Sequence, residues 1–272
     1  MSTSDAELMF PEENSNIARP FIHVFPRHQH KRNTLPSWVL DLQQTGSKSR
    51  SQCVYVDTVQ SLGSPKVDKM AATNIARIST KNSALFLCDM QEKFRKTISY
   101  YPQILQVSSR MLQAAQILDI PVIVTEQYPK GLGPTVSELD VSKCPVFPKM
   151  KFSMMLPEVE EHLKQYPNVK NILLCGIEGH VCVQSTALDL QQKGFQTNVI
   201  VDAVSSRSMV DRMYALQRMK EGGAHLTTSE SVILGLVEGS DHPDFRAIQK
   251  IIWDSAPDSG LLGKTFNGET PV

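Results

Sequence analysis

The sequence lacks a long apolar run and an excess of charge of either sign. No apolar run in its 272 residues approaches the roughly 18 needed to span a bilayer. Lys and Arg together number 28, as do Asp and Glu, so the formal net charge of zero gives no overall attraction to nucleic acid or acidic membranes. The first residues, MSTSDAELMFPEENS, lack the basic-then-apolar layout of a secretory signal. We therefore expect an intracellular, cytoplasmic protein that binds neither membranes nor nucleic acid, with mitochondrial and nuclear locations as alternatives.

Cysteine is infrequent, and the arrangement of the five cysteines argues against two common uses of this residue. Their number is odd, they are far apart, and no two form a C-x-x-C pair. Neither a disulfide framework nor a structural zinc site is therefore expected. Three of them lie in or beside apolar runs and are interpreted as core residues: Cys88, Cys144 and Cys175. Cys182 differs, because it lies where an apolar run gives way to a predicted helix.

Residues 1–80 lack an apolar period long enough to build a core. This part begins acidic, then turns basic, and is rich in Ser, Gln, Asn and Pro. We therefore predict a disordered or loosely ordered extension here, a folded domain at 81–262 and a flexible tail at 263–272. Residues 36–42, PSWVLDL, are a candidate helical turn or docking segment for a protein partner, and Met70 is a candidate start of a shorter product.

From residue 83 onward the sequence alternates regularly between apolar runs and amphipathic segments. Six runs are predicted to be strands: SALFLC (83–88), PVIVTE (121–126), CPVF (144–147), NILLCGI (171–177), QTNVIVDA (196–203) and GAHLTTS (223–229). Between them, apolar residues recur at spacings of three and four, as Ile104, Val107 and Met111 do, which is typical of amphipathic helices. Strands that are apolar throughout indicate a parallel sheet covered on both faces. We therefore predict a three-layer α/β/α fold around a mainly parallel six-stranded sheet.

Glycine-rich phosphate-binding motifs are missing. No G-x-G-x-x-G follows the first apolar run, and no G-x-x-x-x-G-K-[ST] occurs anywhere. Dinucleotide-binding and P-loop interpretations therefore both fail at their first requirement, and no cofactor is predicted. The expected ligand is a small-molecule substrate, bound outside the carboxyl ends of the strands.

Three reactive groups lie at or just after the ends of the first, third and fourth runs, namely Asp89, Lys149 and Cys182. A thiol attacks as its thiolate, which a nearby cation and a helix N-terminus both favour. A carboxylate can take the proton from sulfur and pass it to a leaving group. Backbone N–H groups in the tight turn before the helix can stabilise a developing oxyanion. Together these groups predict nucleophilic catalysis.

Each of the three residues also has a purely structural interpretation. Asp89 can be a loop or helix cap. Lys149 can be a solvated lysine like its neighbour Lys151, and Cys182 can be a small core residue. Convergence at three strand ends favours the chemical interpretation over three separate structural roles.

Six segments resemble, in order and spacing, the isochorismatase-like cysteine hydrolase superfamily, and within it the animal isochorismatase domain-containing proteins. These segments are LFLCDMQEKF, PVIVTEQYPKGLG, KMKFSM, LLCGIEGHVCVQSTALDL, VIVDAVSSRS and GAHLTTSE. The resemblance covers roughly residues 80–262 and does not include the N-terminal extension. It implies a Rossmann-like parallel sheet, in agreement with the fold predicted from the apolar runs.

The resemblance also implies a catalytic triad of Asp89, Lys149 and Cys182. Asp89 opens a D-x-Q-x-x-F-like motif with Gln91 and Phe94, and Lys149 opens a K-x-x-x-S motif. In this scheme Asp89 is a general base and then a general acid. Lys149 holds the thiolate and the aspartate in register.

A non-proline cis peptide bond is a further feature of the family, and the resemblance implies one at Ile177–Glu178. The N–H groups of Glu178 and Cys182 are thereby implied as the oxyanion hole. The substrate pocket is expected to be lined by Gln91, Phe94, Gln127 and Tyr128, with Glu126 as a further candidate. For the residues after the second strand, loop scaffolding is the alternative role.

The complete Asp-Lys-Cys set argues against isochorismatase activity itself, because members that cleave the vinyl ether usually lack the cysteine. It implies that a thiolate adds to a carbonyl or nitrile-like carbon. An amide or related C–N bond then breaks through a thioester, and water releases the acid. The alternative is a catalytically silent binding or regulatory protein that keeps the fold.

Nicotinamidases of this family bind a metal through an aspartate and histidines after the second strand. Here no histidine occurs between His30 and His162, so neither a metal nor nicotinamide hydrolysis is predicted. The resemblance also implies a homo-oligomer.

Three polar residues near these strand ends are assigned no part in catalysis. His180 is two residues from Cys182 and is expected to face away from it. Asp202 is expected to anchor the loop that follows it through N–H bonds. Arg207 is expected to pair with Asp211 four residues on, with recognition of an acidic substrate as the alternative.

Overall fold

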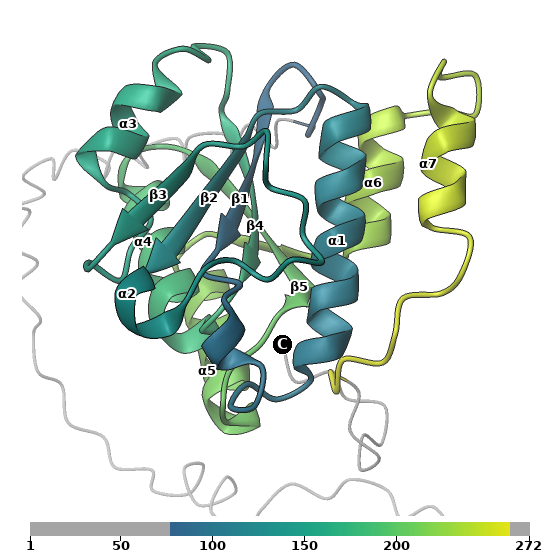
Figure 1. Cartoon of the computed structure of the whole chain (residues 1–272). Coiled ribbons are helices and arrows are strands. Elements are labelled where there is room, and N and C mark those ends of the chain that lie inside the picture. The colour runs from purple at the N-terminus through teal and green to yellow at the C-terminus, as the bar shows by residue number, and fades with distance from the viewer. Residues whose placement is uncertain (1–76, 262–272) are drawn as a thin grey trace, which may run out of the picture. The chain divides into compact units, whose positions relative to one another are not determined.

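The computed structural model describes residues 77–261, and Figure 1 shows their arrangement. Nearly all of the predicted extension at 1–80 lies outside the described residues, as do the 36–42 segment, Met70 and the predicted tail at 263–272. The predictions made for these parts, and the domain boundaries drawn from them, stay predictions.

Six strands form one parallel sheet in the described part of the chain. They are β1 (Ser83–Cys88), β2 (Val122–Gln127), β3 (Val146–Lys149), β4 (Asn171–Gly176), β5 (Gln196–Val204) and β6 (His225–Thr227). Neighbouring strands pair in the order β3-β2-β1-β4-β5-β6, and every pair is parallel. β1 and β4 are buried at every position, which explains why their sequences are apolar almost throughout rather than alternating.

Helices cover both faces of the sheet (Figure 1). One side carries α1 (Tyr101–Ile117) and α6 (Ser229–Val237), with α7 (Phe245–Ile251) packed against α1, and the other carries α3 (Pro157–Leu163), α4 (Gln184–Gln192) and α5 (Met209–Glu221). Successive strand residues point to opposite faces. Leu85 and Leu87 therefore join the core beneath α1, whereas Ala84 and Phe86 join the core on the side of α3, α4 and α5. The predicted three-layer α/β/α fold is confirmed.

Local sequence signals decide where several helices begin. Prolines occupy the first turn of α1 and of α3, where the missing N–H has no intrahelical partner. α5 begins after Ser208, whose hydroxyl accepts a hydrogen bond from the N–H of Asp211 at 3.3 Å. Between residues 77 and 261, no helix is long and apolar enough to cross a membrane.

The third strand is displaced from its predicted position. The sequence predicts a strand over 144–147, whereas β3 runs from Val146 to Lys149. The limits of β3 are set by its pairing with β2 and not by a run of apolar residues. Gln127, the last residue of β2, is in register with Lys149, the last residue of β3. Cys144, predicted as a core residue, is instead half-buried just before the strand. This displacement makes Lys149 the last residue of β3, next to the end of β2.

The strand order reverses direction in the middle of the sheet. The chain passes from β1 through β2 to β3 at one edge and then returns to add β4 on the other side of β1. In such sheets ligands bind at this switch point, outside the carboxyl ends of the two central strands. Asp89 follows β1 directly, and the turn that leads to Cys182 follows β4. The fold therefore brings two of the three candidate residues to the switch point.

Cys175 in β4 allows a test of the buried core through its pH dependence. Burial, and to a smaller extent the Asp202 carboxylate, raise the pKa of the Cys175 thiol well above its ordinary value of 9.0. Above about pH 9 the unfolded chain therefore releases a proton that the folded chain retains, so the free energy of unfolding falls as the pH rises. Cys175→Val removes this contribution and should make the alkaline loss between about pH 9 and about pH 10 smaller by about 1 kcal/mol.

Urea unfolding at these two pH values measures the effect. Ile172→Val is the matched control, because it shortens a buried side chain of the same strand without removing a titrating group. Equal alkaline losses in the wild type and in Cys175→Val would contradict the prediction.

Candidate active site

Asp89 lies immediately after β1, with its carboxylate buried and fully hydrogen-bonded. Oδ1 accepts a hydrogen bond from the hydroxyl of Thr125 in β2 at 2.8 Å. Oδ2 accepts one from the thiol of Cys88 at 3.5 Å and lies 2.7 Å from the Lys149 ammonium. The backbone N–H of Asp89 donates to the carbonyl of Thr125 at 3.1 Å. Both strands therefore fix the orientation of the carboxylate.

Lys149 forms a buried ion pair with Asp89, and the exposed fractions of the two side chains are 0% and 1%. Burial alone lowers the pKa of the Lys149 ammonium, but Cys88, Asp89 and Cys182 around it outweigh burial and raise the pKa above its ordinary value of 10.5. The lysine is therefore a cation at neutral pH.

Cys182 lies in the π-helical turn η3 (Gly179–Val183), which leads into α4. Its exposed fraction is 7%. The hydroxyl of Thr186 donates to the Cys182 carbonyl at 2.7 Å and accepts from the N–H of Met154 at 2.9 Å, which ties this turn to the loop after β3. π-helical turns are often found at functional sites. Here the turn brings the Cys182 thiol into contact with Cys88 and near the Lys149 ammonium.

Cys88 is a second thiol at the same place. The pKa of the Cys88 thiol lies well above its ordinary value of 9.0. Burial is the main cause, and contact with Cys182 and the charge of Asp89 add to it. A thiol held in its protonated form is a poor nucleophile. Of the two sulfur atoms in contact, Cys182 is therefore the candidate nucleophile.

The turn between β4 and Cys182 has an unusual backbone. Gly176 has a φ of +118°, and the peptide bond Ile177–Glu178 is cis, as the family resemblance implied. The N–H of Ile177 donates to the Cys88 carbonyl at 3.0 Å, and that of Gly179 to the Ser205 carbonyl at 2.8 Å. Across residues 77–261, the N–H of Glu178, which lies between these two, donates to no protein acceptor. Its role as part of an oxyanion hole stays a prediction.

Side chains of the same turn are bound to the loop after β5. Glu178 pairs with Arg207 at 3.0 Å, so the expected pairing of Arg207 with Asp211 is wrong. An i,i+4 pairing requires both residues to be helical, whereas Arg207 lies two residues before α5 begins. The ring Nδ1 of His180 is 3.1 Å from the hydroxyl of Ser206.

The four predicted pocket residues have different environments. Gln91 is fully buried and bonds to backbone groups of Gln127 and Gly133 through both ends of its amide. Phe94 is partly buried against the core beneath α1. Gln127 reaches the Lys149 ammonium, and Tyr128, with an exposed fraction of 48%, precedes the short helix α2 (Pro129–Leu132). Contact with a substrate stays a prediction for all four.

The neighbouring Glu126 and the more distant Asp202 both organise backbone. The Glu126 carboxylate accepts from the N–H and the hydroxyl of Thr135, at 2.7 and 2.9 Å. Asp202 accepts from the N–H and hydroxyl of Ser229, at 2.9 and 2.6 Å, and so anchors the start of α6. Asp202 thus bonds to an N–H as predicted, but the predicted target, the loop that follows it, is wrong, because the partner Ser229 lies 27 residues further along the chain.

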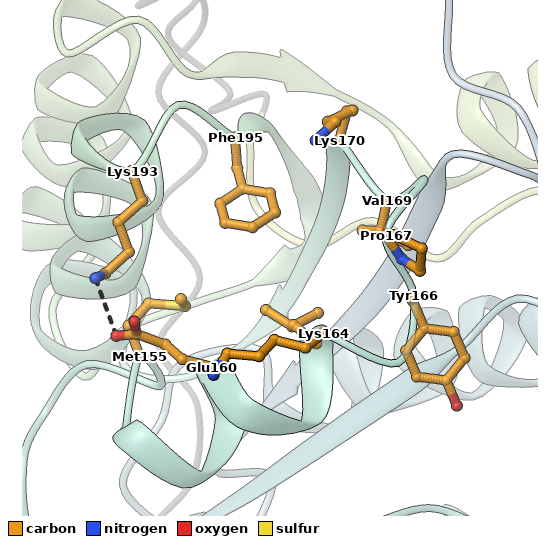
Figure 2. A pocket seen from close by; sticks show the side chains of 10 residues that line it. Met155, Glu160, Lys164, Tyr166, Pro167, Val169, Lys170, Lys193 and Phe195 are labelled. Carbon is orange, nitrogen blue, oxygen red and sulfur yellow. Dashed lines mark ion pairs between the residues drawn. The ribbon is translucent and has the colours of Figure 1, made fainter.

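A surface hollow at the other end of the sheet is separate from this cluster. Figure 2 shows it beside α3 and the segments that precede β4 and β5, with Lys193 paired to Glu160 at 3.0 Å. No residue of the Asp-Lys-Cys cluster lines it. Within the described residues, no three His, Cys, Asp or Glu side chains are grouped so that they could hold a metal ion.

Sequence reasoning missed the residues that hold the cluster in place, namely Thr125, Thr186 and Cys88. A usable signal existed for Thr125, because a hydroxyl in a fully buried strand needs a hydrogen-bond partner. Thr186 carries no comparable signal, since threonine within a helix commonly bonds to a carbonyl of its own helix.

The fold and the site together define an α/β protein with a buried carboxylate, lysine and cysteine at the topological switch point of a parallel sheet. Comparison with known proteins assigns the family. The isochorismatase domain matches residues 83–231, which is more than half of the chain, and the chain therefore belongs to the isochorismatase-like hydrolase family.

Individual relatives agree with this assignment. Isochorismatase domain-containing protein 2 of Xenopus laevis is 56% identical over 188 residues, covering 69% of this chain and 92% of the relative. A structure described as the MAR1 ribonuclease of Caenorhabditis elegans is 55% identical, with a TM-score of 0.66, covering 69% of this chain and 97% of that one. The YcaC gene product of Escherichia coli, described as an octameric hydrolase of unknown specificity, is 22% identical with a TM-score of 0.61, covering 65% and 89% of the two chains, and shares the fold.

Proposed function

We propose that this protein is a cysteine hydrolase that cleaves an amide or related C–N bond of a small molecule. The observation that carries the proposal is the buried ion pair of Lys149 and Asp89, 2.7 Å apart, next to the Cys182 thiol. A buried cation favours the thiolate, and a carboxylate beside it can accept and return a proton.

The proposed reaction has two steps. Asp89 takes the proton from the Cys182 sulfur as the sulfur attacks the carbonyl carbon, and the oxyanion is bound by the N–H groups of Glu178 and Cys182. The C–N bond then breaks, Asp89 gives its proton to the departing nitrogen, and a thioester remains on Cys182. In the second step Asp89 takes a proton from water, which attacks the thioester, and the acid leaves as the sulfur regains its proton.

Access to the cluster limits the size of the substrate. The exposed fraction of Asp89 is 1%, that of Lys149 is 4% and that of Cys182 is 7%. We infer that so little exposure favours a small planar amide over the backbone of a folded polymer. RNA is the polymer to compare with small amides, because the similar C. elegans structure is described as a ribonuclease.

Iodoacetamide labelling at neutral pH tests the proposal against the alternative of a catalytically silent binding protein. We expect Cys182 to be modified at least about tenfold faster than Cys88, Cys144 and Cys175, because a thiolate reacts faster than a protonated thiol. Cys88 and Cys175 are fully buried, and Cys144 is partly buried. Burial is the main reason that the pKa of each of these three thiols is raised. Lys149→Ala should remove the preference for Cys182.

Peptide mapping by mass spectrometry gives the rate at each cysteine. Slow and equal modification of Cys182 and of Cys88, Cys144 and Cys175 would support the binding protein. A fast reaction at Cys182 that persists in Lys149→Ala would mean that the lysine does not activate the sulfur.

A further inference from the structure

The Lys149 ammonium has three hydrogen-bond donors and three close acceptors. Its Nζ lies 2.7 Å from Asp89 Oδ2, 2.7 Å from Gln127 Oε1 and 2.8 Å from the Phe152 carbonyl. A fourth contact, to the Lys151 carbonyl, is longer at 3.2 Å. An ammonium group can donate three hydrogen bonds. Gln127 therefore holds one of the three acceptor positions around the lysine.

The Gln127 side chain is fixed in the orientation that presents oxygen to the lysine. Its amide nitrogen donates to the Met150 carbonyl at 3.0 Å, so a flipped amide would face that carbonyl with oxygen and the ammonium with nitrogen. Its backbone is held as well, because the Gln91 amide accepts from its N–H at 2.8 Å and donates to its carbonyl at 2.9 Å. Gln127 is thus rigid at both ends of the residue.

We infer that Gln127 is a positioning residue, which holds the Lys149 ammonium against Asp89 and Cys182 and must be a neutral acceptor to do so. The inference rests on the proposed function, since it concerns the same cysteine. When the Cys182 proton is lost to solvent and Asp89 stays ionised, the buried cluster carries one positive and two negative charges. A carboxylate at position 127 would add a third negative charge beside the same cation and would compete with the thiolate for it.

The pH dependence of Cys182 alkylation depends on the charged and titratable groups around the thiol. Cys88 and Asp89 lie at the end of β1, and Lys149 lies at the end of β3. The turn that holds Cys182 also contains Glu178, which pairs with Arg207, and His180, which contacts Ser206. α5, which packs against η3, presents Asp211 and Arg218 beside His180. Among these, Gln127 contacts only the lysine, so a change at 127 reaches the sulfur through Lys149.

The test is the pH dependence of Cys182 alkylation in the full chain. Gln127→Glu should move the midpoint of this profile upward by about one pH unit or more, because the cation is then shared among more anions. Gln127→Met keeps the volume but removes the acceptor at 2.7 Å and leaves that N–H only the longer contact to the Lys151 carbonyl at 3.2 Å, so it should move the midpoint in the same direction by a smaller amount. Gln106→Glu, the same change at an exposed position of α1, should leave the midpoint unchanged.

Three outcomes separate the possible failures. Wild-type midpoints in folded Gln127→Glu and Gln127→Met, shown by unchanged thermal melting, would overturn the inference while leaving the proposed function intact. A wild-type protein in which Cys182 reacts no faster than the other cysteines would overturn the proposed function itself. A midpoint shift in Gln127→Glu but not in Gln127→Met would show that added charge alone acts, and would overturn the positioning role.

Discussion

Replacing Lys149 by methionine is expected to lower the free energy of unfolding by about 3–5 kcal/mol and to slow Cys182 alkylation at neutral pH by at least about tenfold. The stability is lost because the Asp89 carboxylate, with an exposed fraction of 1%, keeps its burial and loses its cation. Removing one partner of a buried ion pair leaves an uncompensated charge in a poorly polarisable environment. The alkylation slows because the same ammonium favours the thiolate.

Lys151 offers a matched control two residues away. Its side chain is 59% exposed and lies 3.4 Å from the Asp189 carboxylate, so Lys151→Met should cost less than about 1 kcal/mol. The double variant Asp89→Asn with Lys149→Met should recover part of the lost stability, because no charge then remains unpaired. It should not recover the alkylation rate. Urea unfolding and peptide mapping measure the two effects, and equal costs for Lys149→Met and Lys151→Met would contradict this account.

Gly176→Ala is expected to destabilise the fold by about 4 kcal/mol or more, or to prevent folding. Gly176 has a φ of +118°, a conformation that residues with a Cβ rarely adopt. A Cβ built there would lie 2.1 Å from the Cys88 carbonyl oxygen, which is backbone of the neighbouring strand and cannot rotate away. The close approach exists because Gly176 pairs with Cys88 at the switch point, where Ile177 then bonds to the same carbonyl.

Gly194→Ala separates backbone strain from the steric clash. Gly194 also has a positive φ, +80°, but nothing lies within 4 Å of the position its Cβ would take. Its substitution should therefore cost only the left-handed conformation, about 1–2 kcal/mol. Soluble yield and urea unfolding compare the two variants. Losses of similar size would mean that the two central strands can separate at Gly176 to admit a methyl group.

The apolar runs carried most of the information about the fold. β1 and β4 are buried on both faces, so their almost uninterrupted apolar sequences indicate central strands of the sheet. β3 was harder to predict, because its last residues are Pro148 and Lys149 and its limits follow from pairing with β2. That pairing is a property of two strands together, which the pattern within either strand does not contain.

The candidate site was predictable where strand ends alone determine it. Asp89 directly follows β1 and Lys149 ends β3, and the parallel sheet brings those strand ends to one edge. The environment of each group was less predictable, because it depends on contacts between distant segments. Gln127 bonds to a lysine 22 residues on, and Arg207 bonds to a glutamate 29 residues back rather than to its helical neighbour. Such contacts arise from the loops between elements, whose paths have no periodic sequence signature.

Trapping an acyl group on the protein tests the central claim most directly. The full chain would be incubated with small amides, ureas and nitriles, with an RNA oligonucleotide as comparison, and mapped by peptide mass spectrometry. We predict that at least one small compound is turned over and leaves an acyl or imidate adduct on Cys182 alone. Cys182→Ala should show neither turnover nor adduct. Turnover by Cys182→Ala at the wild-type rate, or RNA cleavage independent of Cys182, would contradict an active sulfur held ready by its neighbouring cation and carboxylate.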